Sequence, residues 1–109
     1  HLQRSTDFVA RYGGEEFVAI TLGNTSEAAF NYFKRIRQAV EDLHIEHDAS
    51  VSPWVTISMG GVTVFPKVGD NYDTYLKIAD GMLYDAKRLS RNQVVWANER
   101  MVQWKERES

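Results

Sequence analysis

The alternation of apolar and polar residues near the start of the chain predicts a β-hairpin. Residues 7–11 and 16–22 alternate or run apolar, in the manner of half-buried strands. The glycine pair Gly13-Gly14 lies between these two stretches. Such a pair suits a type I′ turn, because that turn needs positive φ at both central residues. We therefore expect two strands joined by a tight turn.

A helical period follows the hairpin. Asn24, followed three residues later by Glu27, resembles a capping box at the start of a helix. Apolar side chains then recur at spacings of three and four, at Ala29, Phe33, Ile36, Val40 and Leu43. This pattern predicts an amphipathic helix over residues 26–43. Residues 44–53 lack a clear period and predict a loop, with a short strand at 50–52.

The second half of the chain predicts a long strand, a helix and a further strand. Apolar and polar residues alternate over 54–65, and Gly60-Gly61 favours a bulge or bend there, because these residues lack a Cβ. Helical spacing returns over 73–89, where Gly81 indicates a close approach of another element. Residues 93–97 predict the last strand.

The order of these elements predicts a single α+β domain. A chain of 109 residues has room for one core, and it buries about 65% of the surface that its unfolded form exposes. We expect a mixed or antiparallel central sheet with both helices able to lie on one face. The domain is expected to cover residues 1–97. Residues 98–109 are expected to form a C-terminal tail, as a terminal helix with Trp104 as an anchor.

Composition narrows the classes of function. The 13 Lys and Arg residues against 15 Asp and Glu give a net charge of −2, which argues against binding a nucleic acid polymer through a basic surface. Any anionic ligand must then be met by a local cluster of cations. The absence of cysteine excludes disulfides and thiolate metal sites. No apolar run approaches the roughly 18–20 residues of a membrane span, so we expect a cytoplasmic domain without a membrane segment.

Two carboxylates stand beside the glycine turn. Glu15 and Glu16 are adjacent, and neighbouring strand residues point to opposite faces, so we expect only one of them to be a metal ligand. A hard cation such as Mg²⁺ uses few protein oxygens together with substrate phosphates, so one glutamate suffices for its part of such a site. The alternative is a solvated hairpin tip with two surface acids.

Cations at three other places could meet an anionic ligand. Lys87 and Arg91 stand four apart at the end of the second predicted helix, where they either hold phosphates or simply favour the helix dipole. Arg4 and Asp7 stand three apart ahead of the first strand, which is typical of a surface ion pair. Arg35 sits among Lys34 and Arg37 on the first predicted helix, and we assign Arg35 to a solvated face.

Taken in order, these motifs resemble the GGDEF family of diguanylate cyclases. The string RYGGEEF at residues 11–17 is similar to the family signature in its glutamate form. TISMG at 56–60 is similar to the T-x-S-x-G strand of the family, and ADGMLYDAK at 79–87 resembles its A-D-x-x-L-Y-x-A-K helix. Arg91-Asn92 matches the pair that follows. The resemblance covers nearly all of residues 4–97 and implies the palm-like fold of nucleotide cyclases.

The resemblance implies a role for each matching residue. Gly13-Gly14 would lie against GTP, and Glu15 would coordinate the divalent cations, Mg²⁺ or Mn²⁺, that bridge its phosphates. Glu16 would be required beside it. Lys87 and Arg91 would hold the phosphates. The reaction would join two GTP into cyclic di-GMP with release of two pyrophosphates, between two chains facing each other as a homodimer.

The resemblance also implies a product-inhibition site. Arg4 and Asp7 stand where the family has its R-x-x-D motif, which binds a dimer of cyclic di-GMP, and Arg35 stands where an additional arginine often contacts that ligand. Ser90 replaces the usual glycine before the Arg-Asn pair.

The resemblance also suggests that part of the domain lies upstream of this chain. The family domain carries roughly as many as seventy further residues ahead of Arg4, so we expect its N-terminal part, with an aspartate metal ligand, to be absent here. A non-catalytic module that senses cyclic di-GMP is the alternative function, and the upstream sequence discriminates the two.

Overall fold

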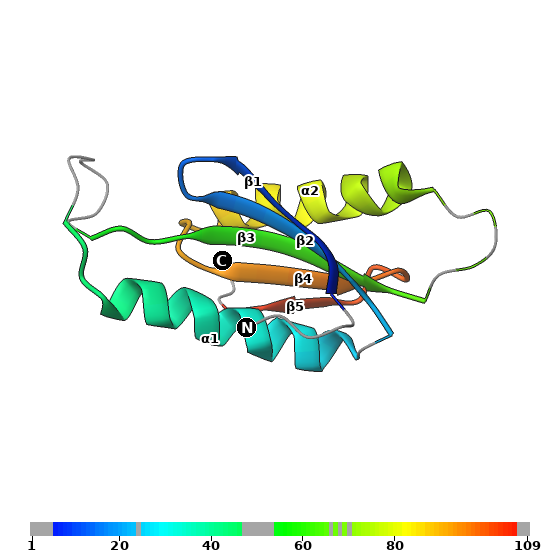
Figure 1. Cartoon of the computed structure of the whole chain (residues 1–109), viewed down its shortest axis with the longest axis horizontal. Coiled ribbons are helices and arrows are strands. Elements are labelled where there is room, and N and C mark those ends of the chain that lie inside the picture. The colour runs from blue at the N-terminus through cyan, green and yellow to red at the C-terminus, as the bar shows by residue number, and fades with distance from the viewer. Residues whose placement is uncertain are drawn as a thin grey trace.

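A mixed five-stranded sheet with two helices forms the domain (Figure 1). The computed structural model describes residues 6–23, 25–46, 54–65, 67, 69 and 71–106, and the strand expected at 50–52 lies outside that part. The elements are β1 (Thr6–Gly13), β2 (Glu16–Leu22), α1 (Ser26–Asp42), β3 (Ser58–Val64), α2 (Tyr72–Arg88), β4 (Val94–Asn98) and β5 (Gln103–Lys105). The α+β class expected from the sequence is confirmed.

The sheet is parallel in its centre and antiparallel at its two edges. The strands lie in the order β1-β2-β3-β4-β5, and β2, β3 and β4 run parallel to one another. β1 pairs antiparallel with β2, and β5 pairs antiparallel with β4. The terminal helix expected after residue 97 is therefore wrong, because Gln103–Lys105 adds an edge strand instead. Trp104 does act as an anchor, since it packs on the apolar cluster beneath α1.

The two helices cover opposite faces of the sheet, not one face as the sequence led us to expect (Figure 1). Alternate residues of β2 divide between the faces: Val18 and Ile20 pack under α2, whereas Ala19 packs under α1. The same division holds in β3 and β4. The central strands are apolar at even and odd positions alike, so both of their faces need a covering layer.

Gly60-Gly61 allows close packing on both faces of β3 and produces no bulge. β3 pairs in regular register with both neighbours through these residues. A Cβ at Gly60 would lie 2.0 Å from the backbone nitrogen of Leu83 in α2, and a Cβ at Gly61 would lie 2.1 Å from the Trp96 ring. The close approach expected at Gly81 is wrong, because a Cβ there would meet nothing within 4 Å. The glycine that allows the contact lies in the strand, not in the helix.

The start and the end of α1 differ in detail from the sequence prediction. Thr25 is the N-cap, and its hydroxyl accepts a hydrogen bond from the Ala28 amide at 3.1 Å. Asn24, the expected cap, lies outside the described residues. At the other end, Leu43 is 66% exposed and does not join the buried face. The core contribution of α1 therefore comes from its first half, with Phe33 stacked on Trp96 at a centroid distance of 5.1 Å.

Candidate active site at the glycine turn

The glycine turn joins β1 to β2 and leaves its backbone open to a ligand. Gly13 ends β1 and pairs with Glu16, while Gly14 has a φ of 52°. Positive φ is absent at Gly13 and Glu15, so the hairpin is confirmed but the type I′ turn is wrong. A Cβ placed on either glycine would meet nothing within 4 Å. Arg11 braces the turn, because its Nε donates to the Gly14 carbonyl at 2.8 Å.

Glu16 brings the two expected phosphate-binding cations to this turn. Its Oε1 accepts from Lys87 Nζ at 3.3 Å, and its Oε2 accepts from Arg91 Nη1 at 3.0 Å. All three side chains are partly open to solvent, with exposed fractions of 28% for Glu16, 33% for Lys87 and 51% for Arg91. Residues more than seventy positions apart in the sequence thus form one charged cluster beside the glycines.

The two cations also change the titration of Glu16. Burial raises the pKa of this carboxyl, but the hydrogen bonds from Arg91 and Lys87 and the charges of both cations outweigh burial. The pKa of Glu16 therefore lies below its usual 4.5. The carboxylate is ionised at neutral pH, and both of its oxygens are available to orient the cations.

A Schellman motif at the end of α2 positions the loop that carries Arg91. Leu89 is the C-cap, the Ser90 amide donates to the Lys87 carbonyl at 3.3 Å, and the Arg91 amide donates to the Ala86 carbonyl at 2.9 Å. Ser90 has a φ of 94°, a left-handed conformation that favours glycine. The helix end therefore keeps the geometry of a glycine C-cap with a serine in that place.

The backbone of Glu15, in the turn, is hydrogen-bonded to the first residue of β3. Its carbonyl accepts from the Ser58 amide at 2.9 Å, and its side chain is half-buried. Within the described part of the chain, no group of three or more acidic or histidine side chains forms a complete cation site. Glu15 offers the oxygen donor that Mg²⁺ or Mn²⁺ prefers, and these cations need only one or two carboxylates when phosphates supply further oxygens. Glu15 could therefore supply one of the oxygen ligands of such a site.

Tyr12 links the end of β1 to the middle of α2. Its hydroxyl is hydrogen-bonded to the side chain of Asp80, which belongs to the motif at 79–87. Burial, then this hydrogen bond, and then the negative charge of Asp80 raise the pKa of Tyr12 to about 12. Together with the cluster around Glu16, this contact gives the hairpin a second attachment to α2.

The expected inhibitory site lies largely outside the described part of the structure, so its assembly stays a prediction. Arg4 lies outside the described residues, and Asp7 lies in β1 with a side chain that is also outside the description. Arg35 is exposed on α1, in agreement with a solvated face. These residues keep the roles implied by the resemblance as predictions.

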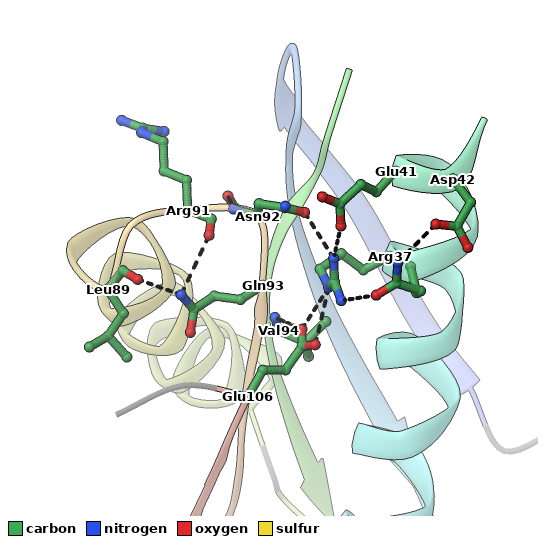
Figure 2. A network of polar contacts seen from close by, with 11 residues as sticks. Arg37, Glu41, Asp42, Leu89, Arg91, Asn92, Gln93, Val94 and Glu106 are labelled. Atoms are coloured by element: carbon green, nitrogen blue, oxygen red, sulfur yellow. Dashed lines mark hydrogen bonds and ion pairs between the residues drawn. The ribbon is translucent and has the colours of Figure 1, made fainter. Parts of the chain in front are cut away.

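Arg37 is a residue to which sequence reasoning gave no role. It is buried, not solvated, and its guanidinium forms ion pairs with Glu41 and Glu106 (Figure 2). A signal for its burial was present, because Arg37 follows Phe33 by four residues and so lies on the same face of α1. Its partner Glu106 had no such signal.

A groove at the opposite end of the strands lies apart from this cluster. It has a volume of about 410 Å³ and is lined by residues from the start of α1, the ends of β3 and β4 and the segment leading into β5. None of Glu15, Glu16, Lys87 and Arg91 lines it. Its lining residues are Thr25, Ser26, Glu27, Thr63, Phe65, Asn98, Glu99, Arg100 and Trp104.

The fold and the cluster define a domain with a glycine turn, two acids and two convergent cations at one end of a mixed sheet. A family model described as "Diguanylate cyclase, GGDEF domain" matches residues 1–93. The chain belongs to this family of cyclic di-GMP signalling domains. No helix in the described part of the chain has the length and apolar character needed to cross a membrane.

Curated relatives carry the same family name. The chain is 32% identical over 90 residues to the probable diguanylate cyclase DgcC of Escherichia coli K12, covering 83% of this chain and 24% of the relative. It is 36% identical over 91 residues to diguanylate cyclase A of Treponema denticola, covering 84% and 24%. It is 38% identical over 93 residues to the probable diguanylate cyclase DgcT of Escherichia coli K12, covering 84% and 20%.

The chain thus spans between a fifth and a quarter of the length of these relatives. No solved structure matches it.

Proposed function

We propose that this chain contributes the glycine turn and the phosphate-binding cations of a diguanylate cyclase, which condenses two GTP into cyclic di-GMP and two pyrophosphates. The observation that carries the proposal is the convergence of Lys87 and Arg91 on Glu16, beside a turn whose two glycines leave the backbone open. Phosphate groups need close backbone approach and neighbouring cations, and this end of the sheet offers both. A purely structural cluster would need no open glycine turn.

The proposed roles follow from the position of each group. Gly13-Gly14 lets the nucleotide approach the turn, and Lys87 and Arg91 neutralise phosphate charge. Glu16 orients the side chains of Lys87 and Arg91 beside the turn, because it accepts a hydrogen bond from each of them. Glu15 would supply an oxygen to Mg²⁺ or Mn²⁺, which when bound offsets the charge of the triphosphate.

The bond changes are those of a nucleotidyl transfer. The 3′-oxygen of one GTP forms a bond to the α-phosphorus of the other, and the bond from that phosphorus to the oxygen of the leaving pyrophosphate breaks, in line. The proton of the 3′-hydroxyl passes to solvent. Two such transfers close the ring of cyclic di-GMP. If each domain holds one GTP, two chains must face each other, so we propose a homodimer as the active form.

The proposal includes feedback by the product and a cytoplasmic location. Arg4, Asp7 and Arg35 would bind cyclic di-GMP, with the arginines contacting phosphate or guanine acceptors and the aspartate accepting from guanine N–H groups. The cytoplasm is the compartment that supplies GTP.

A turnover assay tests the proposal directly. The full-length gene product is supplied with GTP and Mg²⁺, and cyclic di-GMP is measured by chromatography. Glu15→Ala should reduce the rate by more than about tenfold, equivalent to roughly 1.4 kcal/mol in the barrier, while the fold is retained. Binding of cyclic di-GMP without any turnover of GTP would replace the cyclase by the sensor alternative. Turnover by Glu15→Ala above about a tenth of the parental rate would remove Glu15 from the site.

A further inference from the structure

A buried arginine connects α1, the residue that follows β5 and the loop that carries Arg91. Arg37 Nε donates to both carboxylate oxygens of Glu106, at 3.1 and 2.9 Å. Its Nη1 donates to Asn92 Oδ1 at 3.0 Å and to Glu41 Oε1 at 2.9 Å. Figure 2 shows the guanidinium at the centre of these contacts, between α1 and the strand that begins after the loop. One side chain thus joins three segments that are distant in the sequence.

The acid of this pair also holds the backbone after the loop. The side chains of Arg37 and Glu106 are only 7% and 9% exposed. Glu106 Oε2 accepts from the Val94 amide at 2.6 Å, at the first residue of β4. Charges so poorly hydrated are retained in proteins when they are paired and hydrogen-bonded on several sides. The pair therefore constrains the protein on both sides of Asn92 and Gln93.

The loop between α2 and β4 needs such support. Three successive non-glycine residues have positive φ: 94° at Ser90, 62° at Arg91 and 50° at Asn92. Residues in this region of conformational space persist only where the surroundings hold them. Asn92 is held from two sides, because its amide donates to Ser58 Oγ at 3.0 Å and its Oδ1 accepts from Arg37.

We propose that Arg37 and Glu106 form a clamp that positions Arg91 for the phosphates of GTP. Asn92, the residue after Arg91, receives the Arg37 hydrogen bond, while Arg91 directs its guanidinium away from the clamp (Figure 2) to Glu16 at 3.0 Å. Arg37 and Glu106 are positioning residues, since they act on Arg91 through Asn92 and the Val94 amide. This inference rests on the proposed function.

The clamp makes the C-terminal segment part of the site's support. Glu106 lies beyond residues 1–93, the part that matches the family model. It follows directly on β5, whose pairing with β4 brings it under α1. Arginine suits the central position because its planar fork can donate to several acceptors at once, whereas lysine presents a single point charge.

The test compares two double variants that change charge equally. Arg37→Gln with Glu106→Gln replaces the buried ion pair by two amides of similar size, so neither partner is left as a lone buried charge. Arg100→Gln with Glu99→Gln makes the same change at two exposed residues at the other end of the strands. Both are made in the full-length gene product, and the folded fraction of each is measured by chemical unfolding.

Amide hydrogen exchange reports on the loop without any nucleotide. Relative to the control pair, the clamp variant should exchange the amides of Arg91, Asn92 and Val94 at least about tenfold faster, because local opening sets exchange rates. Amides in the middle of α2 should be protected as in the parent. Unchanged exchange at the loop overturns the clamp, whatever the enzyme does.

Equilibrium binding of GTP with Mg²⁺ reports on the consequence for the site. Per folded molecule, the clamp variant should bind at least about fivefold more weakly than the parent, and the control should bind as the parent does. In an Arg91→Ala background the clamp variant should cause no further loss, because two changes that act through one group are not additive. A merely structural pair would lower the folded fraction and leave the affinity of folded molecules unchanged.

The outcomes separate this inference from the proposed function. A parent protein that binds GTP, with a clamp variant of equal affinity or a fully additive loss beside Arg91→Ala, overturns the clamp alone. A parent protein that binds no GTP overturns the proposed function and the role of the clamp with it. Faster exchange at the loop together with weaker, non-additive GTP binding supports the clamp.

Discussion

Replacing Glu16 by glutamine tests whether this residue organises the charged cluster at the glycine turn. Glutamine keeps the size of the side chain and one oxygen acceptor, but it removes the negative charge that pairs with Lys87 and Arg91. The ion pairs measure 3.3 and 3.0 Å, and their side chains are 28–51% exposed. Partly exposed pairs of this kind are each worth about 0.2–1 kcal/mol, because solvent screens them. We expect Glu16→Gln to lower the free energy of unfolding by about 1 kcal/mol.

The dependence on salt and pH distinguishes this effect from a loss of packing. The difference between parent and Glu16→Gln should shrink in about 0.5 M salt, where charges are screened within roughly 4 Å. Because the pKa of Glu16 in the folded protein lies below its usual 4.5, the stabilisation is fully present above pH 4.5. It is lost as the pH falls below 4.5 through the lowered pKa, when the carboxylate takes up a proton.

Urea unfolding of parent and variant at several pH values supplies the measurement. Glu99→Gln is the matched control, because Glu99 is an exposed acid whose carboxylate accepts from the Phe65 amide at the other end of the strands. A loss above about 3 kcal/mol that persists in salt would mean that Glu16 acts through packing. A difference that keeps its full size as the pH falls below 4.5 would show that the pKa of Glu16 is not lowered.

Four further predictions concern three backbone positions and Tyr12. Ser90→Gly should raise the free energy of unfolding by about 1 kcal/mol, because it removes the cost of a side chain at a φ of 94°; a destabilised variant in thermal melts would contradict this. Gly60→Ala should cost about 3 kcal/mol or more, since a Cβ there would lie 2.0 Å from a backbone nitrogen of α2. Gly81→Ala, in open space, should instead add about 1 kcal/mol, and melts that rank the two alanine variants the other way would refute the packing argument. The hydrogen bond from Tyr12 to Asp80 should stabilise the fold fully below pH 10 and be lost as the pH rises towards 12, through the raised pKa of the tyrosine. Ultraviolet titration of parent and Tyr12→Phe checks this, and a Tyr12 that ionises near 10 would contradict it.

The sequence by itself determined every helix and strand up to β4 and marked the location of the candidate site. The hairpin, the two helices and the strands on either side of α2 follow from short-range periodicity, because each reports which residues of one element face a core. The motif at 11–17 and the cations at 87 and 91 marked the site, because their chemistry is readable without coordinates. Those two regions were expected to meet at phosphate, and the structure brings them together through Glu16.

Only the tertiary structure decided which surfaces the elements share. Periodicity says that a helix has a buried face but not which side of the sheet receives it, so the placement of α1 and α2 on opposite faces could not be derived from it. The close approach was expected at Gly81 and is found at Gly60 for the same reason, because a close approach depends on what lies opposite a residue. β5 is a strand because β4 offers an edge to pair with. Its three residues are too few for a periodic pattern to predict this strand.

Arg37 shows most clearly what short-range sequence patterns leave undetermined. Its spacing from Phe33 places it on the buried face of α1, yet a charged residue in such a place is intelligible only with its partner. That partner, Glu106, stands 69 residues further along the chain. Local sequence sets the conformation of each segment, whereas pairing across such a separation depends on the packing of all the segments between them, which only the folded chain provides.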